Sequence, residues 1–172
     1  MIANKYTWEL IEMPASLVGV NTLVPNRLVK KSVLLGAIEG LCGYDSLRTE
    51  VPYGRSSRID LLLENGSRRC FVEIKNCTLV EGGTAYFPDA VTHRGLKHLI
   101  ELQQMVREGN RSVMLYLVQR TDAKGFRPAD HIDPAYGRQL RKARENGVEV
   151  LAYDVVLDLE GIRLNRILPC HI

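Results

Sequence analysis

The stretch SRIDLLLENGSRRCFVEIK, residues 57–75, contains two apolar runs with a turn signal between them. The runs at 59–63 and 70–75 are rich in the aliphatic and aromatic residues that favour strands. Between them lies Asn65-Gly66, the dipeptide that most strongly indicates a short hairpin. We therefore predict two antiparallel strands joined by a tight turn at Asn65-Gly66.

The predicted hairpin separates charged from apolar side chains, because residues two apart along a strand share a face. A two-residue turn at Asn65-Gly66 would place Asp60 opposite Phe71 and Arg58 opposite Glu73. One face is then wholly apolar and consists of Ile59, Leu61, Leu63, Cys70, Val72 and Ile74. The other face carries the charges and consists of Arg58, Asp60, Leu62, Phe71, Glu73 and Lys75.

Two carboxylates on this charged face, Asp60 and Glu73, suit a divalent cation. Diagonal positions on neighbouring strands lie roughly 7–8 Å apart, so both side chains can converge on one ion. Mg²⁺ or Mn²⁺ fits such a place, since Mg²⁺ binds through one or two carboxylates and completes its shell with water and phosphate. Lys75 would lie beside the cation and orient or deprotonate an attacking water. The alternative is a solvated face whose ion pairs contribute about 0–1 kcal/mol each.

Periodicity along the rest of the chain alternates between strand and helix patterns. Further strands are predicted at 6–11, 47–53, 112–119 and 148–156, and helices at 26–36, 89–108 and 136–145. Asn26 and Asp89 are candidate helix caps, and Asp133-Pro134 is a natural helix entry. Hairpins followed by helix-linked strands predict an α/β fold, a three-layer sandwich with a mixed sheet.

The composition is that of one soluble domain. The chain has 172 residues, of which 45% are hydrophobic, and its 23 basic and 20 acidic residues leave a net charge of +3. Its longest apolar runs, about six residues, are far below the length of a spanning helix, so no membrane partner is predicted. The start carries no secretory signal, and the four cysteines lack disulfide or metal spacing, which favours a cytoplasmic protein.

The chain resembles the sugar fermentation stimulation protein A (SfsA) family. The resemblance rests on long unbroken motifs, among them Trp8-Glu9-Leu10, Asn26-Arg27-Leu28-Val29, Tyr53-Gly54, residues 57–63, Val72-Glu73-Ile74-Lys75-Asn76, Phe87-Pro88-Asp89, Val118-Gln119-Arg120 and Phe126-Arg127-Pro128. It implies a restriction-endonuclease-like core of the PD-(D/E)xK type. On that motif, Asp60 and Glu73 become metal ligands, Lys75 becomes the catalytic lysine, and Gln119 matches a supporting polar position.

The family resemblance also bears on domain organisation. Full-length members begin with an OB-fold-like domain, which can hold oligonucleotides and which we expect to be missing from this chain. We expect residues 1–18 to be a remnant strand and linker and residues 19–172 to form the nuclease-like domain.

A DNA partner is the second implication, because family members are regarded as DNA-binding proteins linked to regulation of sugar utilisation. Arg94, Lys97 and His98 share the polar face of the helix at 89–108, and Arg58 lies on the charged hairpin face. These four are the candidate phosphate contacts, although a polar helix face is also simply a solvated one. Only 6% of the residues are aromatic, so we expect contacts to the DNA backbone rather than base stacking.

Three functions stay open at this point. The first is DNA binding with divalent-metal-dependent phosphodiester hydrolysis. The second is a catalytically inactive regulatory module, and the third is a fragment that needs a partner domain to bind DNA. The sequence does not fix the oligomeric state, so a homo-oligomer is open as well.

Overall fold

A six-stranded mixed sheet forms the centre of the computed structural model, which describes residues 7–54 and 56–172. The strand order is β11-β10-β8-β5-β4-β3. The three central strands, β5, β8 and β10, run parallel, and the outer strands are antiparallel to their neighbours. The bounds are β3 (Ser46–Tyr53), β4 (Ser57–Asn65), β5 (Arg68–Cys77), β8 (Arg111–Val118), β10 (Glu149–Asp158) and β11 (Gly161–Ile167).

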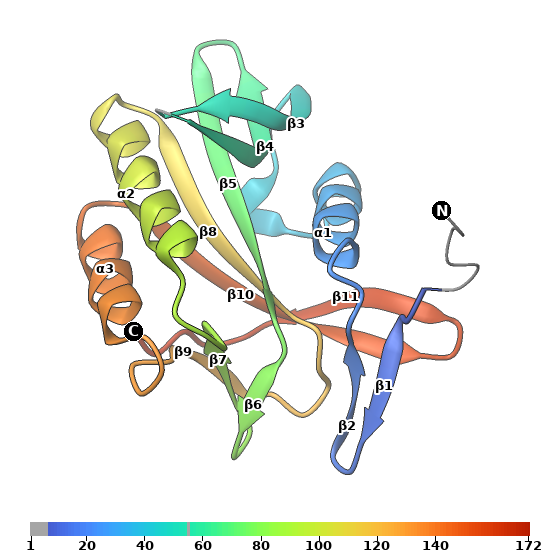
Figure 1. Ribbon diagram of the computed structural model, residues 1–172. Coiled ribbons are helices and arrows are strands. Elements are labelled where there is room, and N and C mark those ends of the chain that lie inside the picture. Colours follow the sequence, from blue (N-terminus) through green and yellow to red (C-terminus); the bar gives the residue numbers. More distant parts are fainter. Residues whose placement is uncertain (1–6, 55) are drawn as a thin grey trace, which may run out of the picture.

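Helices cover both faces of this sheet (Figure 1). Helices α2 (His93–Arg107) and α3 (Pro134–Glu145) lie on one face, and α1 (Val24–Leu34) lies on the other. Each interface is a buried apolar cluster. Leu99 of α2 and Leu140 of α3 belong to one cluster, and Val29 of α1 belongs to the other. Strand β8 contributes to both clusters, which explains its continuous apolar sequence. The predicted three-layer α/β sandwich is therefore confirmed.

Two small sheets flank the main one. A hairpin of β1 (Leu10–Met13) and β2 (Ser16–Gly19) forms the first. The second contains β6 (Leu79–Glu81), β7 (Thr84–Phe87) and β9 (Gly125–Pro128), and it lies beyond the ends of β5 and β8 (Figure 1). A short 3₁₀ helix, η1, spans Glu39–Leu41. Of the strand predicted at 6–11, Tyr6 lies outside the described residues, and the strand observed nearby is β1.

The starts of two helices differ from the prediction. Helix α1 begins at Val24 with Pro25 in its first turn, where the fixed φ of proline suits a helix. Asn26 therefore lies inside the helix and is not its cap. Helix α2 is capped by Thr92 instead of Asp89, and the Thr92 hydroxyl accepts a hydrogen bond from the Gly95 amide at 3.0 Å. The cap at Asp89 was wrong by about one helical turn.

Asp133 begins α3 as predicted, and it also joins two helices. Its carboxylate accepts hydrogen bonds from the amide of Tyr136 at 2.9 Å and from the amide of Thr92 at 3.0 Å. Only 4% of Asp133 is exposed. The side chain thus fixes the start of α3 against the start of α2.

The register of the β4–β5 hairpin also differs from the prediction. Asn65 pairs with Arg68 and Leu62 pairs with Phe71, so the turn consists of Gly66-Ser67. Gly66 has a φ of 57°, and a glycine at the first turn position is typical of a type II′ turn. The predicted turn at Asn65-Gly66 is therefore shifted by one residue. As a result, Asp60 does not lie opposite Phe71.

Among the described residues, no helix is both long and apolar enough to cross a membrane.

Candidate metal centre and DNA-binding groove

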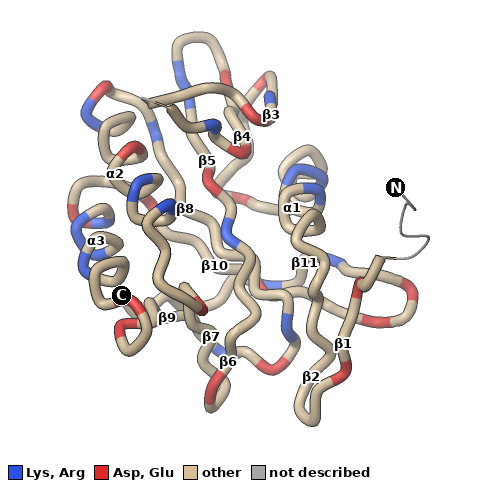
Figure 2. Tube along the Cα trace, viewed as in Figure 1, with Lys and Arg blue, Asp and Glu red and all other residues tan. Residues whose placement is uncertain are grey.

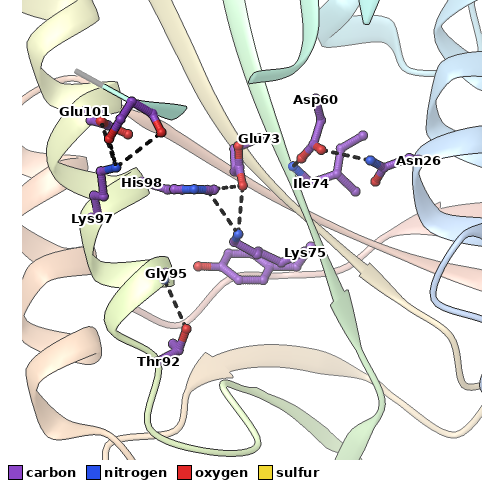
Figure 3. Close-up of polar contacts among 12 residues, drawn as sticks. Asn26, Asp60, Glu73, Ile74, Lys75, Thr92, Gly95, Lys97, His98 and Glu101 are labelled. Carbon is purple, nitrogen blue, oxygen red and sulfur yellow. Dashed lines mark hydrogen bonds and ion pairs between the residues drawn. The ribbon is translucent and has the colours of Figure 1, made fainter. Parts of the chain in front are cut away.

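Asp60 lies at a fork in the central sheet. The β4–β5 pairing ends at Leu61 and Val72, and beyond this pair the two strands separate. The Asp60 carboxylate occupies the fork, where Oδ2 accepts a hydrogen bond from the Ile74 amide at 2.7 Å. Its Oδ1 accepts a second hydrogen bond at 2.8 Å from the side chain of Asn26 in α1 (Figure 3). The carboxylate thereby compensates for pairing that β5 loses at this point.

The predicted alternation of side chains breaks at Asp60. Most of the hairpin follows it, because Leu61 and Leu63 pack under α1 while Leu62 packs under α2 and α3. Ile59, however, joins the cluster of Leu62 and does not share a face with Leu61. Opposite this break in β4, Glu50 of β3 has a positive φ of 54° and the β3–β4 pairing skips a position. The predicted apolar face that included Ile59 is therefore wrong.

Glu73 lies beside the fork on the α2 side of β5. Its Oε1 accepts a hydrogen bond from Lys75 Nζ at 2.7 Å and contacts Nδ1 of His98 (Figure 3). Glu73 is 2% exposed and His98 is 3% exposed, while the side chain of Lys75 is 14% exposed. A buried carboxylate thus has two nitrogen partners on a single oxygen.

The two carboxylates have opposite electrostatic properties. Burial alone would raise the pKa of Glu73, but the bond from His98 and the charge of Lys75 outweigh it and lower that pKa. Burial and the neighbouring Glu73 carboxylate raise the pKa of Asp60 to about 6, even though the Ile74 amide and Asn26 act in the other direction. The charge of Glu73 thus acts directly on Asp60.

The donor set fits a hard divalent cation. Glu73 Oε2 is buried and has no hydrogen-bond partner among the described residues. Each oxygen of Asp60 accepts one hydrogen bond and keeps a second lone pair. Within the described part of the chain, no three His, Cys, Asp or Glu side chains gather as a ligand set. A cation here would therefore depend on two carboxylates and on water or phosphate, as Mg²⁺ commonly does.

A basic groove of about 550 Å³ adjoins this centre. Arg58 and Lys97 line it from two elements and are each anchored: Arg58 donates to the Glu50 carbonyl at 2.7 Å, and Lys97 donates to the Ser56 hydroxyl at 2.7 Å. Arg94 lines the same groove and is exposed. Lys and Arg also gather along α1 and α3 (Figure 2), so basic surface is not confined to this groove.

Two predicted site residues lie elsewhere than the sequence suggested. His98 lines the groove but is buried against Glu73, and does not share the exposed helix face of Arg94. Gln119 follows the end of β8 and donates to the Asn76 side chain at 2.8 Å. In the described structure, the side chain of Gln119 makes no hydrogen bond to Asp60, Glu73 or Lys75. The structure thus brings Asp60, Glu73, Lys75 and His98 together, and Gln119 contacts the side chain of Asn76, the residue after Lys75.

Sequence reasoning missed Tyr53 and underrated Asn26. The Tyr53 hydroxyl is buried without a hydrogen-bond partner among the described residues, and its pKa is raised by burial and by the carboxylates of Glu73, Glu101 and Asp60. The next residue, Gly54, packs so closely on Glu101 that a Cβ would lie 2.8 Å from the Glu101 carboxyl carbon. The family motif Tyr53-Gly54 was the available signal.

Comparisons with known proteins agree on one family. The model of the sugar fermentation stimulation protein RE domain matches residues 23–161. A sugar fermentation stimulation protein homolog from Pelobacter propionicus is 57% identical over 167 residues, which span 97% of this chain and 73% of that protein. A homolog from Geobacter sulfurreducens is 55% identical over 164 residues, which span 95% of this chain and 70% of that protein.

A solved structure resembles the whole fold. It is Pyrococcus furiosus SfsA in complex with Ca²⁺, with a TM-score of 0.88 and 28% identity over 95% of this chain and 71% of that one. The fold is therefore that of a restriction-endonuclease-like α/β domain, as predicted. The chain belongs to the sugar fermentation stimulation protein family.

Proposed function

We propose that this domain binds DNA and hydrolyses its phosphodiester bonds with a divalent cation. The observation that carries the proposal is the fork in the sheet, where a carboxylate oxygen of Glu73 is buried without a partner. Asp60 lies at the same fork, and Lys75 is hydrogen-bonded to Glu73. Structural ion pairs rarely leave a buried carboxylate oxygen unused, because its desolvation is costly.

Asp60 and Glu73 would hold the cation, for which we propose Mg²⁺ or Mn²⁺. Support comes from the Pyrococcus furiosus relative, which was solved in complex with Ca²⁺, another cation that prefers oxygen ligands. When bound, such a cation polarises a phosphoryl oxygen and activates water.

Lys75 supplies the positive charge next to this centre. Its ammonium is held 2.7 Å from Glu73 Oε1, so it is oriented before any substrate arrives. A fixed ammonium stabilises the negative charge that develops on phosphoryl oxygens during hydrolysis. In this proposal Lys75 also orients the attacking water, which is the role that the family motif implies.

Arg58, Arg94 and Lys97 would bind the DNA backbone along the groove. The groove that they line also includes His98, which contacts Glu73 and Lys75, and this supports a phosphate position near Lys75. Contacts of this kind carry little base information and weaken steeply with salt. We therefore expect DNA binding with little sequence preference.

The test is cleavage of plasmid or oligonucleotide DNA by the purified chain with Mg²⁺ or Mn²⁺, beside Asp60→Ala and Lys75→Ala. Cleavage should require the cation and should fall by at least about 100-fold in both variants, because each removes a part of the centre. Equal cleavage by the wild type and both variants would mean a contaminating nuclease and would overturn the assignment.

A second candidate is a DNA-binding regulatory module without catalysis. It is favoured by the satisfied state of Asp60, since both oxygens already accept hydrogen bonds from within the chain. Titration calorimetry separates the two candidates. An absence of Mg²⁺ and Mn²⁺ binding together with salt-sensitive DNA binding would support the module, whereas cation binding would support the nuclease.

The biological setting is part of the proposal. We propose a cytoplasmic protein, as the cysteine pattern favours, and the family resemblance implies that it acts on DNA in the regulation of sugar utilisation. A gel shift at low salt, with the chain alone and with an added OB-fold-like domain, tests whether the domain binds DNA unaided. DNA binding only in the presence of the added domain would show that the nuclease-like chain works as part of an assembly.

A further inference from the structure

His98 is buried beside the carboxylate of Glu73, and the proposed function leaves it without a firm role. It lies in the second turn of α2 and is 3% exposed, so it has little surface left for a DNA phosphate. Its Nδ1 contacts Glu73 Oε1 and lies 3.4 Å from Lys75 Nζ. Both neighbours belong to the proposed catalytic centre.

The chemistry of these groups fixes the direction of the hydrogen bond. An ionised carboxylate can only accept, so His98 Nδ1 carries the proton and donates to Glu73. A protonated Nδ1 cannot also accept from Lys75, and the two nitrogens are therefore neighbours that share one acceptor. Both donors bind Oε1, and none of the described residues donates to Oε2.

This asymmetry restrains rotation of the Glu73 carboxylate. Two donors on Oε1 set the orientation of the group, which leaves Oε2 as the oxygen available to another partner. Lys75 alone would hold it loosely, because the lysine stem has four rotatable bonds. The imidazole of His98 has two and is packed between α2 and β5, so it is the more rigid of the two donors.

We propose that His98 is a positioning residue, which fixes Glu73 through Oε1 and so reserves Oε2 for the divalent cation. The inference rests on the proposed function, because it takes Glu73 as a ligand. In this inference His98 does not contact a DNA phosphate, as the sequence predicted, but supports the metal-binding residue Glu73. Supporting hydrogen bonds of this kind typically change metal affinity or activity by about 10–100-fold when removed.

Two amide variants separate positioning from mere packing. In His98→Asn the amide nitrogen takes the place of Nδ1, whereas in His98→Gln it reaches the place of Nε2. Both are polar and similar in volume, and only the first preserves the donor to Glu73. His98→Leu removes the donor altogether, and His93→Asn, an exposed histidine of the same helix, is the matched control.

The experiment measures Mn²⁺ affinity by titration calorimetry for the wild type and all four variants, after thermal unfolding has shown that each is folded. We expect His98→Asn and His93→Asn to stay within about threefold of the wild type. His98→Gln and His98→Leu should bind Mn²⁺ at least about 10-fold more weakly. If His98→Leu does not fold, the comparison of the Asn and Gln variants still decides.

Three other outcomes would each overturn the role of His98, the proposed function, or both. A wild type that binds Mn²⁺, with Gln and Leu variants that bind it equally well, overturns the role of His98 and leaves the proposed function intact. Equal losses in His98→Asn and His98→Gln also overturn it, because they show that packing and not the donor matters. A wild type that binds neither Mn²⁺ nor Mg²⁺ overturns the proposed function, and the positioning role with it.

Discussion

One carboxylate lies on each side of the β4–β5 fork, and the pKa values of the two shift in opposite directions. On the α2 side, Glu73 meets a lysine and a histidine, and its pKa is lowered in spite of burial. On the α1 side, Asp60 meets a backbone amide and the neutral Asn26, and its pKa is raised to about 6. Both side chains accept two hydrogen-bonding contacts, so the number of donors does not explain the difference.

The kind of donor differs between the two carboxylates. At Asp60, two neutral donors do not cancel the cost of burial together with the repulsion of the nearby Glu73 carboxylate. At Glu73, the hydrogen bond from His98 and the positive charge of Lys75 outweigh the cost of burial. The comparison teaches that burial beside Glu73 raises the pKa of Asp60 to about 6, whereas the pKa of Glu73 stays below its usual value, so a divalent cation bound between them would lower the pKa of Asp60 most.

Removal of Glu73 should have the largest effect. Glu73→Ala leaves Lys75 and His98 beside each other without their acceptor in a buried place, and such loss of one partner typically costs about 3–5 kcal/mol. We expect a fall of that size in the free energy of unfolding, measured by urea denaturation in the presence of EDTA. We also expect loss of Mn²⁺ binding in calorimetry.

The matched control is Glu149→Ala, which breaks an exposed pair with Arg111. It should cost no more than about 1 kcal/mol, because surface pairs contribute little. Equal losses in the two variants would contradict the contrast between buried and exposed acceptors.

Asn26 tests the other side of the fork. Asn26→Ala removes the side-chain donor to Asp60 Oδ1 and leaves the backbone donor in place. We expect Mn²⁺ affinity to fall by roughly 10-fold, because Asp60 is then held by one bond only. Calorimetry measures it, with Asn21→Ala as control, since Asn21 bonds to the exposed Glu9 near the same helix. Equal affinities in the wild type and Asn26→Ala would show that Asp60 needs no such support.

Much of the fold could be predicted from local patterns. The apolar run of β8 predicted a strand buried on both faces, and Asp133-Pro134 predicted the start of α3. Register was harder, because Asn65-Gly66 and Gly66-Ser67 are both plausible turns and only tertiary pairing selects one. The short strands of the outer sheets depend on partners far apart in the chain, which periodicity does not detect.

The candidate site shows where local patterns fail. Alternation predicted that Asp60, Glu73 and Lys75 share one face, but the alternation of β4 breaks at Asp60, opposite the irregular position Glu50 of another strand. The bond between Asn26 and Asp60 joins residues 34 positions apart, so no spacing rule reveals it. The helical pattern identified His98 as polar, whereas its burial depends on packing against β5.

Asp133 provides a buried carboxylate whose hydrogen-bond donors are backbone amides, and so tests how much neutral donors contribute. Burial would raise the pKa of Asp133, but the amides of Thr92 and Tyr136 lower it below its usual range. Asp133→Asn should be less stable than the wild type by about 1 kcal/mol at neutral pH, as for a weakened helix cap.

The difference should depend on pH in one direction. Because the folded pKa is depressed, the stabilisation by Asp133 is complete above the unfolded value of about 3.9 and is lost as pH falls through the folded value. Urea denaturation between neutral pH and roughly pH 3 measures it, and the two proteins should converge at the acid end. A difference that stays constant with pH would show that charge has no part in it.

The smallest effect concerns the basic groove beside Glu73. Arg94 is exposed, so Arg94→Ala should leave the free energy of unfolding within about 0.5 kcal/mol. DNA affinity should fall a few-fold at low salt, and the slope of log affinity against log salt should decrease by about 1, the contribution of one phosphate contact. Fluorescence anisotropy measures the DNA affinity and its dependence on salt. Arg138→Ala in α3 is the control for basic surface outside the groove. An equal change in slope for the two variants would contradict a specific role of the groove. It would mean that DNA contacts the domain through its general charge and not through the face that holds Glu73 and Lys75.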